Sequence, residues 1–216
     1  MKRLITVVLV SIVFLNSKVT AQNCFEINSI LVDACGAPEG ENEMVRFTVG
    51  PSSLSTTNLT VAWPNGLNLY LGICQNANTA VTVAQLNATI QACGYIQEPV
   101  NNTLPANSTV ILATSANLNP AFNSFANLAD TIYMIFQCAG NTNGHFKNYG
   151  SSTPRILIMD FGPACSDTVA YIPDSLIDQT GVHIAADGAA VDFDNAGNPA
   201  KTAEVPTKYF KKSLLF

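Results

Sequence analysis

Charged residues are scarce in this chain of 216 residues: Asp, Glu, Lys and Arg together make up 12% of it, and the formal net charge is −5. A surface with few cations and an acidic balance is a poor partner for the phosphate backbone, so nucleic acid is not expected as a ligand. The low charged fraction, together with many Asn, Thr and Ser residues, is typical of an extracellular β-protein.

The motifs of common catalytic and metal sites are also missing. No Cys-x-x-Cys pair is present, which argues against a zinc thiolate site. His145 and His183 are the only histidines, they form no His-x-x-x-His pair, and no Gly-x-Ser-x-Gly motif accompanies them. We therefore expect both to be ordinary loop residues and predict no catalytic residues. No segment repeats at a fixed period, which argues against a solenoid or propeller.

No apolar run is long enough to span a bilayer, which takes roughly 20 residues. The run over 4–15 follows two cations and precedes the small residues Val19, Thr20 and Ala21, the pattern of a secretory signal peptide. We predict that residues 1–21 are removed and that the mature chain begins at Gln22. Removal takes away three cations and no carboxylate, so the net charge falls from −5 to −8. The expected location is secreted or at the cell surface.

Six cysteines follow this leader: Cys24, Cys35, Cys74, Cys93, Cys138 and Cys165. An even count after a signal peptide favours disulfides. Cys74 ends an apolar segment and Cys93 would lie on the last turn of a helix, so we predict a Cys74–Cys93 bond. Cys24 and Cys35 would be on the order of 30 Å apart across one extended strand, too far to bond to each other. Their pairing with Cys138 and Cys165 stays open.

The stretch from Phe25 to Gly50 reads as a β-hairpin, because two segments rich in alternating or β-branched apolar residues flank a turn containing Gly, Pro and carboxylates. Further strands are predicted over 58–63, 67–74, 109–114, 130–138, 155–161 and 167–172. A helix is predicted with Thr82 as its N-cap and Gln85 completing a capping box, ending at Gly94. Residues 22–175 would form one domain, and 176–216 an irregular extension.

Several stretches resemble the lamin-tail domain family. INSILVDACGAPEGENEMVRFTV resembles its opening strand, acidic turn and strand; LPANSTVILAT (104–114) and FANLADTIYMIF (125–136) resemble two later segments, and DTVAY (167–171) its closing strand. The resemblance covers roughly residues 25–172 in pieces and implies a mainly β, immunoglobulin-like sandwich. The departures are a short helical insert between Cys74 and Cys93, the long loop after Cys138 and an extra strand, RILIMDF.

The mature sequence also resembles the N-terminal module of large secreted surface proteins of gliding bacteria that use type IX secretion. This resemblance implies a non-catalytic binding or adhesion module whose partner is an extracellular protein or a glycan. Two alternatives stay open. A secreted hydrolase would place His145 beside a carboxylate in a deep cleft, and a lectin-like module would expose Trp63 or a platform of tyrosines.

The acidic turn carries four carboxylates, Asp33, Glu39, Glu41 and Glu43. Such hard oxygen ligands suit calcium, although their spacing fits no defined loop and a solvated turn is the alternative. We therefore expect calcium to bind weakly if it binds, and expect no other cofactor. A second oxygen-rich loop, with Asp192, Asp194, Asn195 and Asn198, has Ala196 where an EF-hand would carry a ligand. For Trp63 and the tyrosines, core packing is the favoured reading.

Overall fold

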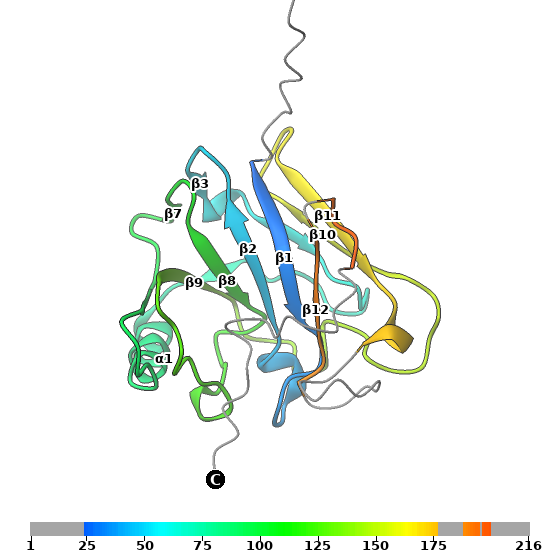
Figure 1. Cartoon of the computed structure of the whole chain (residues 1–216), viewed down its shortest axis with the longest axis horizontal. Coiled ribbons are helices and arrows are strands. Elements are labelled where there is room, and N and C mark those ends of the chain that lie inside the picture. The colour runs from blue at the N-terminus through cyan, green and yellow to red at the C-terminus, as the bar shows by residue number, and fades with distance from the viewer. Residues whose placement is uncertain (1–23, 177–187, 195, 200–216) are drawn as a thin grey trace, which may run out of the picture.

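The computed structural model describes residues 24–176, 188–194 and 196–199. Within them the chain forms a mainly β sandwich of two principal sheets with one short α-helix, so the predicted fold class is confirmed (Figure 1). The predicted signal peptide and His183 lie outside the described residues.

The larger sheet has seven strands in the order β12-β1-β2-β8-β9-β5, and β6 also pairs with β9. Its strands are β1 (Phe25–Leu31), β2 (Met44–Val49), β5 (Ile73–Cys74), β6 (Tyr95–Gln97), β8 (Thr109–Ala113), β9 (Thr131–Gln137) and β12 (Ala190–Asp192). The smaller sheet has the order β11-β10-β4, from β4 (Thr60–Ala62), β10 (Arg155–Asp160) and β11 (Ser166–Tyr171). A two-stranded ribbon joins β3 (Leu54–Ser55) to β7 (Thr103–Leu104).

The predicted hairpin is confirmed, because β1 and β2 pair antiparallel from Phe25↔Val49 to Leu31↔Met44. The register shifts between Ile27 and Ser29, and such a bulge locally frees backbone groups from the ladder. The amide of Ile27 uses this freedom to donate to Asp167 of the smaller sheet at 2.7 Å. The bulge thus ties the two sheets together.

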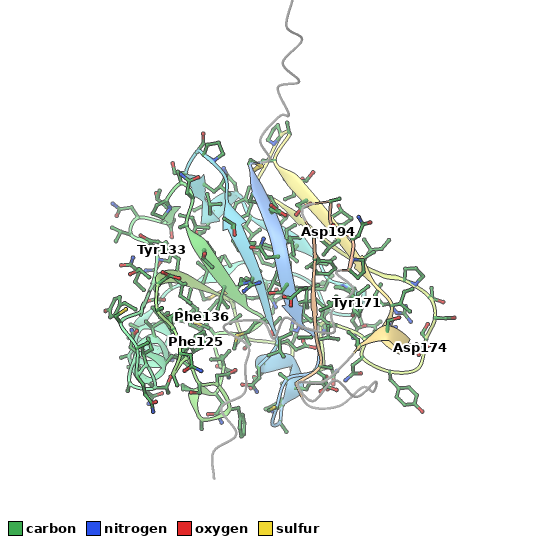
Figure 2. The ribbon with its side chains drawn as sticks, in the orientation of Figure 1. Phe125, Tyr133, Phe136, Tyr171, Asp174 and Asp194 are labelled. Carbon is green, nitrogen blue, oxygen red and sulfur yellow. A yellow bond between two sulfur atoms is a disulfide. The ribbon has the colours of Figure 1, made fainter. Side chains whose placement is uncertain are left out.

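Apolar side chains cover both faces of the larger sheet. On one face, alternate residues of β1, β2, β8 and β9 pack against β4, β10 and β11 to form the main core. On the other, a second cluster joins the sheet to helix α1 (Ala77–Asn87) and the β8–β9 connection. Figure 2 shows Phe125 and Phe136 on the side of α1 and Tyr171 on the side of β10 and β11. The sandwich therefore carries a partial third layer.

The helix begins earlier than predicted. Asn76 caps it, accepting from the amides of Asn78 and Thr79, and the Thr79 side chain completes the capping box. Thr82, the predicted cap, is buried inside the helix, which ends at Asn87. Cys93 consequently lies beyond the helix, in a turn where its thiol donates to the carbonyl of Ala129 at 3.3 Å.

The predicted Cys74–Cys93 bond is therefore wrong. Cys74 bonds to Cys138 instead, with α-carbons 4.9 Å apart, because β5 pairs antiparallel with the end of β9. Cys24 bonds to Cys165 across 141 residues and joins the start of β1 to the turn before β11. The prediction that Cys24 and Cys35 are not bonded to each other is confirmed. Cys35 belongs to neither of these disulfides, so its predicted pairing with Cys138 or Cys165 is wrong.

Two further predictions need correction. Of the strand predicted over 67–74, only Ile73–Cys74 (β5) is a strand, because 67–72 forms a loop; β4 and β5 also belong to different sheets. The predicted irregular extension contributes β12, which pairs with the edge of β1 through Ser29↔Asp192 to Leu31↔Ala190. Ala189, Val191 and Phe193 are buried there, so the domain continues past residue 175. Within the described ranges, no helix is both long and apolar enough to cross a membrane.

Candidate functional site

Three adjacent strands of the larger sheet each place a polar residue at the same end of the main core. The registers pair Met44 with Ala113 and Ala113 with Phe136. The next residue on each strand is Glu43, just before β2, Thr114, just after β8, and Gln137, the last residue of β9. Because side chains alternate along a strand, these three face the main core. All three are buried. They must therefore find hydrogen-bond partners inside the protein.

Gln137 determines which atoms of this network donate hydrogen bonds and which accept them. Its Oε1 accepts from the indole Nε1 of Trp63 at 2.9 Å and from the amide of Leu71 at 3.3 Å. Both partners can only donate, so this atom must be the oxygen. The Nε2 group donates to the carbonyl of Thr114 at 2.9 Å and lies 2.9 Å from Nε2 of His145. A donor therefore faces the histidine.

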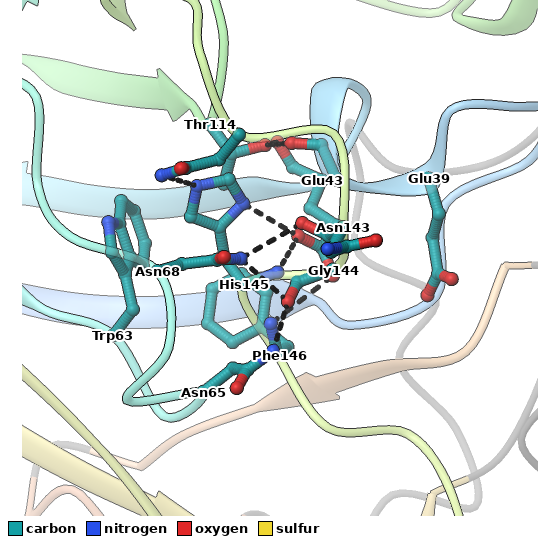
Figure 3. A network of polar contacts seen from close by, with 12 residues as sticks. Glu39, Glu43, Trp63, Asn65, Asn68, Thr114, Asn143, Gly144, His145 and Phe146 are labelled. Atoms are coloured by element: carbon teal, nitrogen blue, oxygen red, sulfur yellow. Dashed lines mark hydrogen bonds and ion pairs between the residues drawn. The ribbon is translucent and has the colours of Figure 1, made fainter.

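The orientation of Gln137 sets the tautomer of His145. Because Nε2 of the ring must accept, the ring proton lies on Nδ1, which is 3.2 Å from Oε2 of Glu43. The same carboxyl group accepts from the backbone amide of His145 at 2.6 Å and from that of Phe146 at 3.3 Å. Figure 3 shows Glu43 surrounded by the 145–146 backbone and the imidazole.

Burial shifts both ionisable groups toward their neutral forms. Glu43 and His145 are each 0% exposed. Burial raises the pKa of Glu43 well above its usual range; the two backbone donors oppose this effect, and nearby Glu39 and Asp33 add to it. Burial lowers the pKa of His145 to about 4. Protonating the ring would also turn a second N–H toward the Gln137 amide donor, so His145 is neutral at pH 7.

Aromatic rings close the remaining side of the network. The ring of Trp63 meets the His145 ring edge-on at 4.9 Å and the Phe146 ring at 5.6 Å. Trp63 is itself only 5% exposed. A Glu–His pair can in principle transfer protons, but a group that reacts must come within hydrogen-bond distance of a substrate. In this structure the pair is hydrogen-bonded to the loops that surround it.

Those loops are the 64–72 loop and the 139–149 loop, together with the turn between β1 and β2. The amide of Asn65 donates to the carbonyl of His145 at 2.8 Å. The side chain of Asn65 donates to Gly144 at 2.8 Å, and that of Asn68 donates to Asn143 and Gly144, both at 2.9 Å (Figure 3). Thr114 reaches the carbonyl of Gly40 in the β1–β2 turn at 2.9 Å. One buried network thus holds three loops.

The predicted calcium ligands are only partly brought together. Asn148 donates to Asp33 at 2.8 Å and to Glu39 at 2.9 Å, so one amide bridges two carboxylates. Glu43 is fully buried rather than part of a solvated turn. Glu41 accepts from Asn117 at 3.0 Å in an exposed contact. Across the described part of the chain, no three His, Cys, Asp or Glu side chains form a grouping that would hold a metal ion. Calcium binding stays a prediction.

The aromatic residues follow the favoured reading in part. Trp63 and Tyr171 are buried in the main core, and Tyr70 packs against it, as core packing predicts. Tyr95 and Tyr149 are exposed. Trp63 is therefore not available as a sugar-stacking surface.

The sequence analysis missed the network, although it held two signals for it. Extending the alternation of Val49, Phe47 and Val45 back by one step reaches Glu43, which places that carboxylate on the inward face of β2. Gln137 similarly ends the most apolar strand on the face of Ile135. Nothing comparable marks His145, which lies in a loop of Gly and Asn residues.

Comparison with known protein families, with curated proteins and with solved structures finds no match for this chain. The resemblance to lamin-tail domains therefore stays a prediction.

Proposed function

We propose that this chain is a secreted, non-catalytic binding or adhesion module of lamin-tail type that acts at the bacterial cell surface or in the extracellular matrix. Its partner would be an extracellular protein or a glycan. The two disulfides support folding in an oxidising compartment, and the acidic, charge-poor composition supports a partner other than nucleic acid.

The observation that carries the proposal is the buried network around His145. It bonds three loops to one another and to the end of the larger sheet, while His145 and Glu43 are both 0% exposed. Recognition modules commonly present loops fixed on a rigid sandwich. The alternative, a hydrolase using His145, needs that ring to reach substrate. Rigid loops around an inaccessible histidine favour binding over turnover.

The test combines binding and turnover. The secreted chain, labelled with a fluorophore, is titrated onto intact producing cells and onto the matrix that they release. We expect saturable binding, and we expect no hydrolysis of chromogenic esters and glycosides. Asn65→Ala/Asn68→Ala removes the side-chain bonds between two loops and should weaken binding about tenfold. Asn58→Ala, at an exposed position, is the matched control and should bind normally.

Two outcomes would contradict the proposal. One is hydrolysis by the native chain that disappears in His145→Gln while binding persists, which would support the hydrolase. The other is no saturable binding to cells or matrix. A lectin-like module would instead show binding that free saccharides compete away, with matrix glycan as the partner.

A further inference from the structure

One short segment turns its apolar side chains toward solvent and its polar side chain inward. In 67–71 (Leu-Asn-Leu-Tyr-Leu), hereafter the leucine loop, Leu67 is 89% exposed, Leu69 72% and Leu71 39%. Asn68 is buried, and Tyr70 packs on the main core. This is the reverse of the usual alternation, in which leucine is buried and asparagine faces water. An exposed apolar cluster of this kind marks a contact surface.

The exposure is fixed by hydrogen bonds along the loop. The amide of Leu71 donates to Gln137 at 3.3 Å, and the carbonyl of Leu69 accepts from the side chain of Asn141 at 3.0 Å. The amide of Asn68 donates to the carbonyl of Asn65 at 2.9 Å, closing a turn. Gly72 then accepts from the amide of Cys138 at 2.9 Å, beside the Cys74–Cys138 disulfide. The leucines are held outward by the same network that contains His145.

The surroundings of the loop carry almost no charge. No Asp, Glu, Lys or Arg occurs anywhere in 47–97, nor in 131–144, which contains Asn141 and the segment beside the loop. The acidic turn reaches Gly144, which has carboxyl oxygens of Glu43 and Glu39 close beside it. Lys147 is the one charged residue of the 139–149 loop, and the carboxyl groups of the acidic turn, beside Gly144, disfavour an anionic surface. A neutral partner is favoured.

The size of the cluster separates a lipid surface from a folded partner. A stable protein interface buries about 1,200–2,000 Å², of which three leucine side chains supply a small part. A lipid interface needs no complementary shape and accepts apolar side chains one at a time, giving reversible attachment that grows with the apolar area inserted. We propose that the leucine loop inserts Leu67 and Leu69 into the interface of a lipid layer with neutral, zwitterionic headgroups.

The experiment is co-sedimentation of the secreted chain with phosphatidylcholine vesicles. We expect binding that is equal at 50 and 500 mM NaCl, because no ion pair contributes, and that weakens when phosphatidylglycerol is added. Leu67→Asn/Leu69→Asn should weaken binding roughly 100-fold, about tenfold for each leucine. Its circular dichroism and melting temperature should match those of the native chain, because the replaced side chains are exposed. Ile156→Thr/Ile158→Thr, which replaces two exposed apolar side chains of β10 by polar ones, should bind like the native chain.

A spectroscopic readout checks the depth. Leu69→Trp adds an exposed indole to the buried Trp63, and its emission should shift to shorter wavelength with vesicles and be quenched by lipids labelled near the headgroup. The inference is overturned if the native chain does not sediment with vesicles, or if the Leu67→Asn/Leu69→Asn variant sediments as well as the native chain. It is equally overturned if that variant only converts a dimer to a monomer, which would assign the loop to contact between copies. Failure here leaves binding to cells or matrix through other surfaces intact.

Discussion

Replacing Glu43 by Gln should make the folded protein sensitive to acid between pH 6.5 and pH 4. In the native chain, the shifts of the two buried groups oppose each other. Between about pH 4.5 and 6.5 the unfolded chain holds one proton on His145 and none on Glu43. In the folded pair, burial raises the pKa of the Glu43 carboxyl well above its usual range and lowers the pKa of His145 to about 4, so protonation shifts from His145 toward Glu43. The contributions of the two groups to the pH dependence of the free energy of unfolding therefore have opposite signs and partly cancel.

The Glu43→Gln variant loses this cancellation. Its unfolded state still protonates His145 at the ordinary pKa of about 6.5, whereas the folded state does so only near the lowered pKa of about 4. The unfolded state binds more protons in between, so the free energy of unfolding falls as the pH falls. At about 1.4 kcal/mol for each pKa unit, the loss that His145 contributes from pH 6.5 to pH 4 reaches about 3 kcal/mol.

The opposite variant should show the opposite slope. In His145→Gln, the folded state keeps the proton of Glu43 above pH 4.5 while the unfolded state has lost it, so the free energy of unfolding falls as the pH rises. Urea unfolding, followed by the fluorescence of the single Trp63 at fixed ionic strength, measures both slopes. His183 is common to the native chain and Glu43→Gln, so its titration cancels in that comparison. A Glu43→Gln slope equal to that of the native chain would refute the reasoning.

Four further predictions concern the cysteines, the half-buried side chain of Asn87 and the acidic turn. Cys24→Ser/Cys165→Ser should lower the free energy of unfolding by about 5 kcal/mol, because the bond closes a loop of sequence separation 141; an unchanged urea midpoint would contradict this. Maleimide should label Cys93 in the native chain, since its thiol is exposed, and label Cys165 only after reduction, as peptide mapping would show. Asn87→Ala should cost about 2 kcal/mol, because it unpairs the amide and carbonyl of Ile96, both bonded at 2.8 Å; a loss under 0.5 kcal/mol in the same assay would count against it. Millimolar calcium should raise the melting temperature by no more than about 2 °C, and a rise of many degrees at micromolar calcium would show a built site in the acidic turn.

The elements predicted correctly are those whose signal is local. The hairpin of β1 and β2 and the apolar strands β8, β9, β10 and β11 carry their own alternation or β-branched runs, which survive any tertiary arrangement. The start of α1 was missed because its box uses Asn76 with Thr79, where the usual sequence signature has Glu or Gln. Strand β12 was missed because its three residues become a strand only through pairing with the edge of β1.

The disulfides illustrate the same limit. The sequence predicts a Cys74–Cys93 bond because Cys74 ends an apolar segment and Cys93 is expected on the last turn of a helix. The partner is decided instead by strand order: β5 lies beside the end of β9, and this neighbour relation exists only once the larger sheet is assembled. Geometry within a single strand was sufficient to exclude Cys24 bonding to Cys35, because that argument needs no knowledge of the rest of the fold.

The polar network required both kinds of information. Alternation places Glu43 and Gln137 inward on their own strands, which sequence can reveal. Their proximity depends on β8 lying antiparallel to β2 and parallel to β9, an order that puts Thr114 between them. The remaining member, His145, lies 102 residues from Glu43, in a loop without periodicity.

Because each buried polar group left unpaired would cost free energy, the row of Glu43, Thr114 and Gln137 at the end of the sheet requires hydrogen-bond partners there. The 139–149 loop supplies one by turning its histidine inward, and its carbonyls then hold the loop that carries Leu67 and Leu69. The buried polar row thereby determines the position of the loop that exposes Leu67 and Leu69.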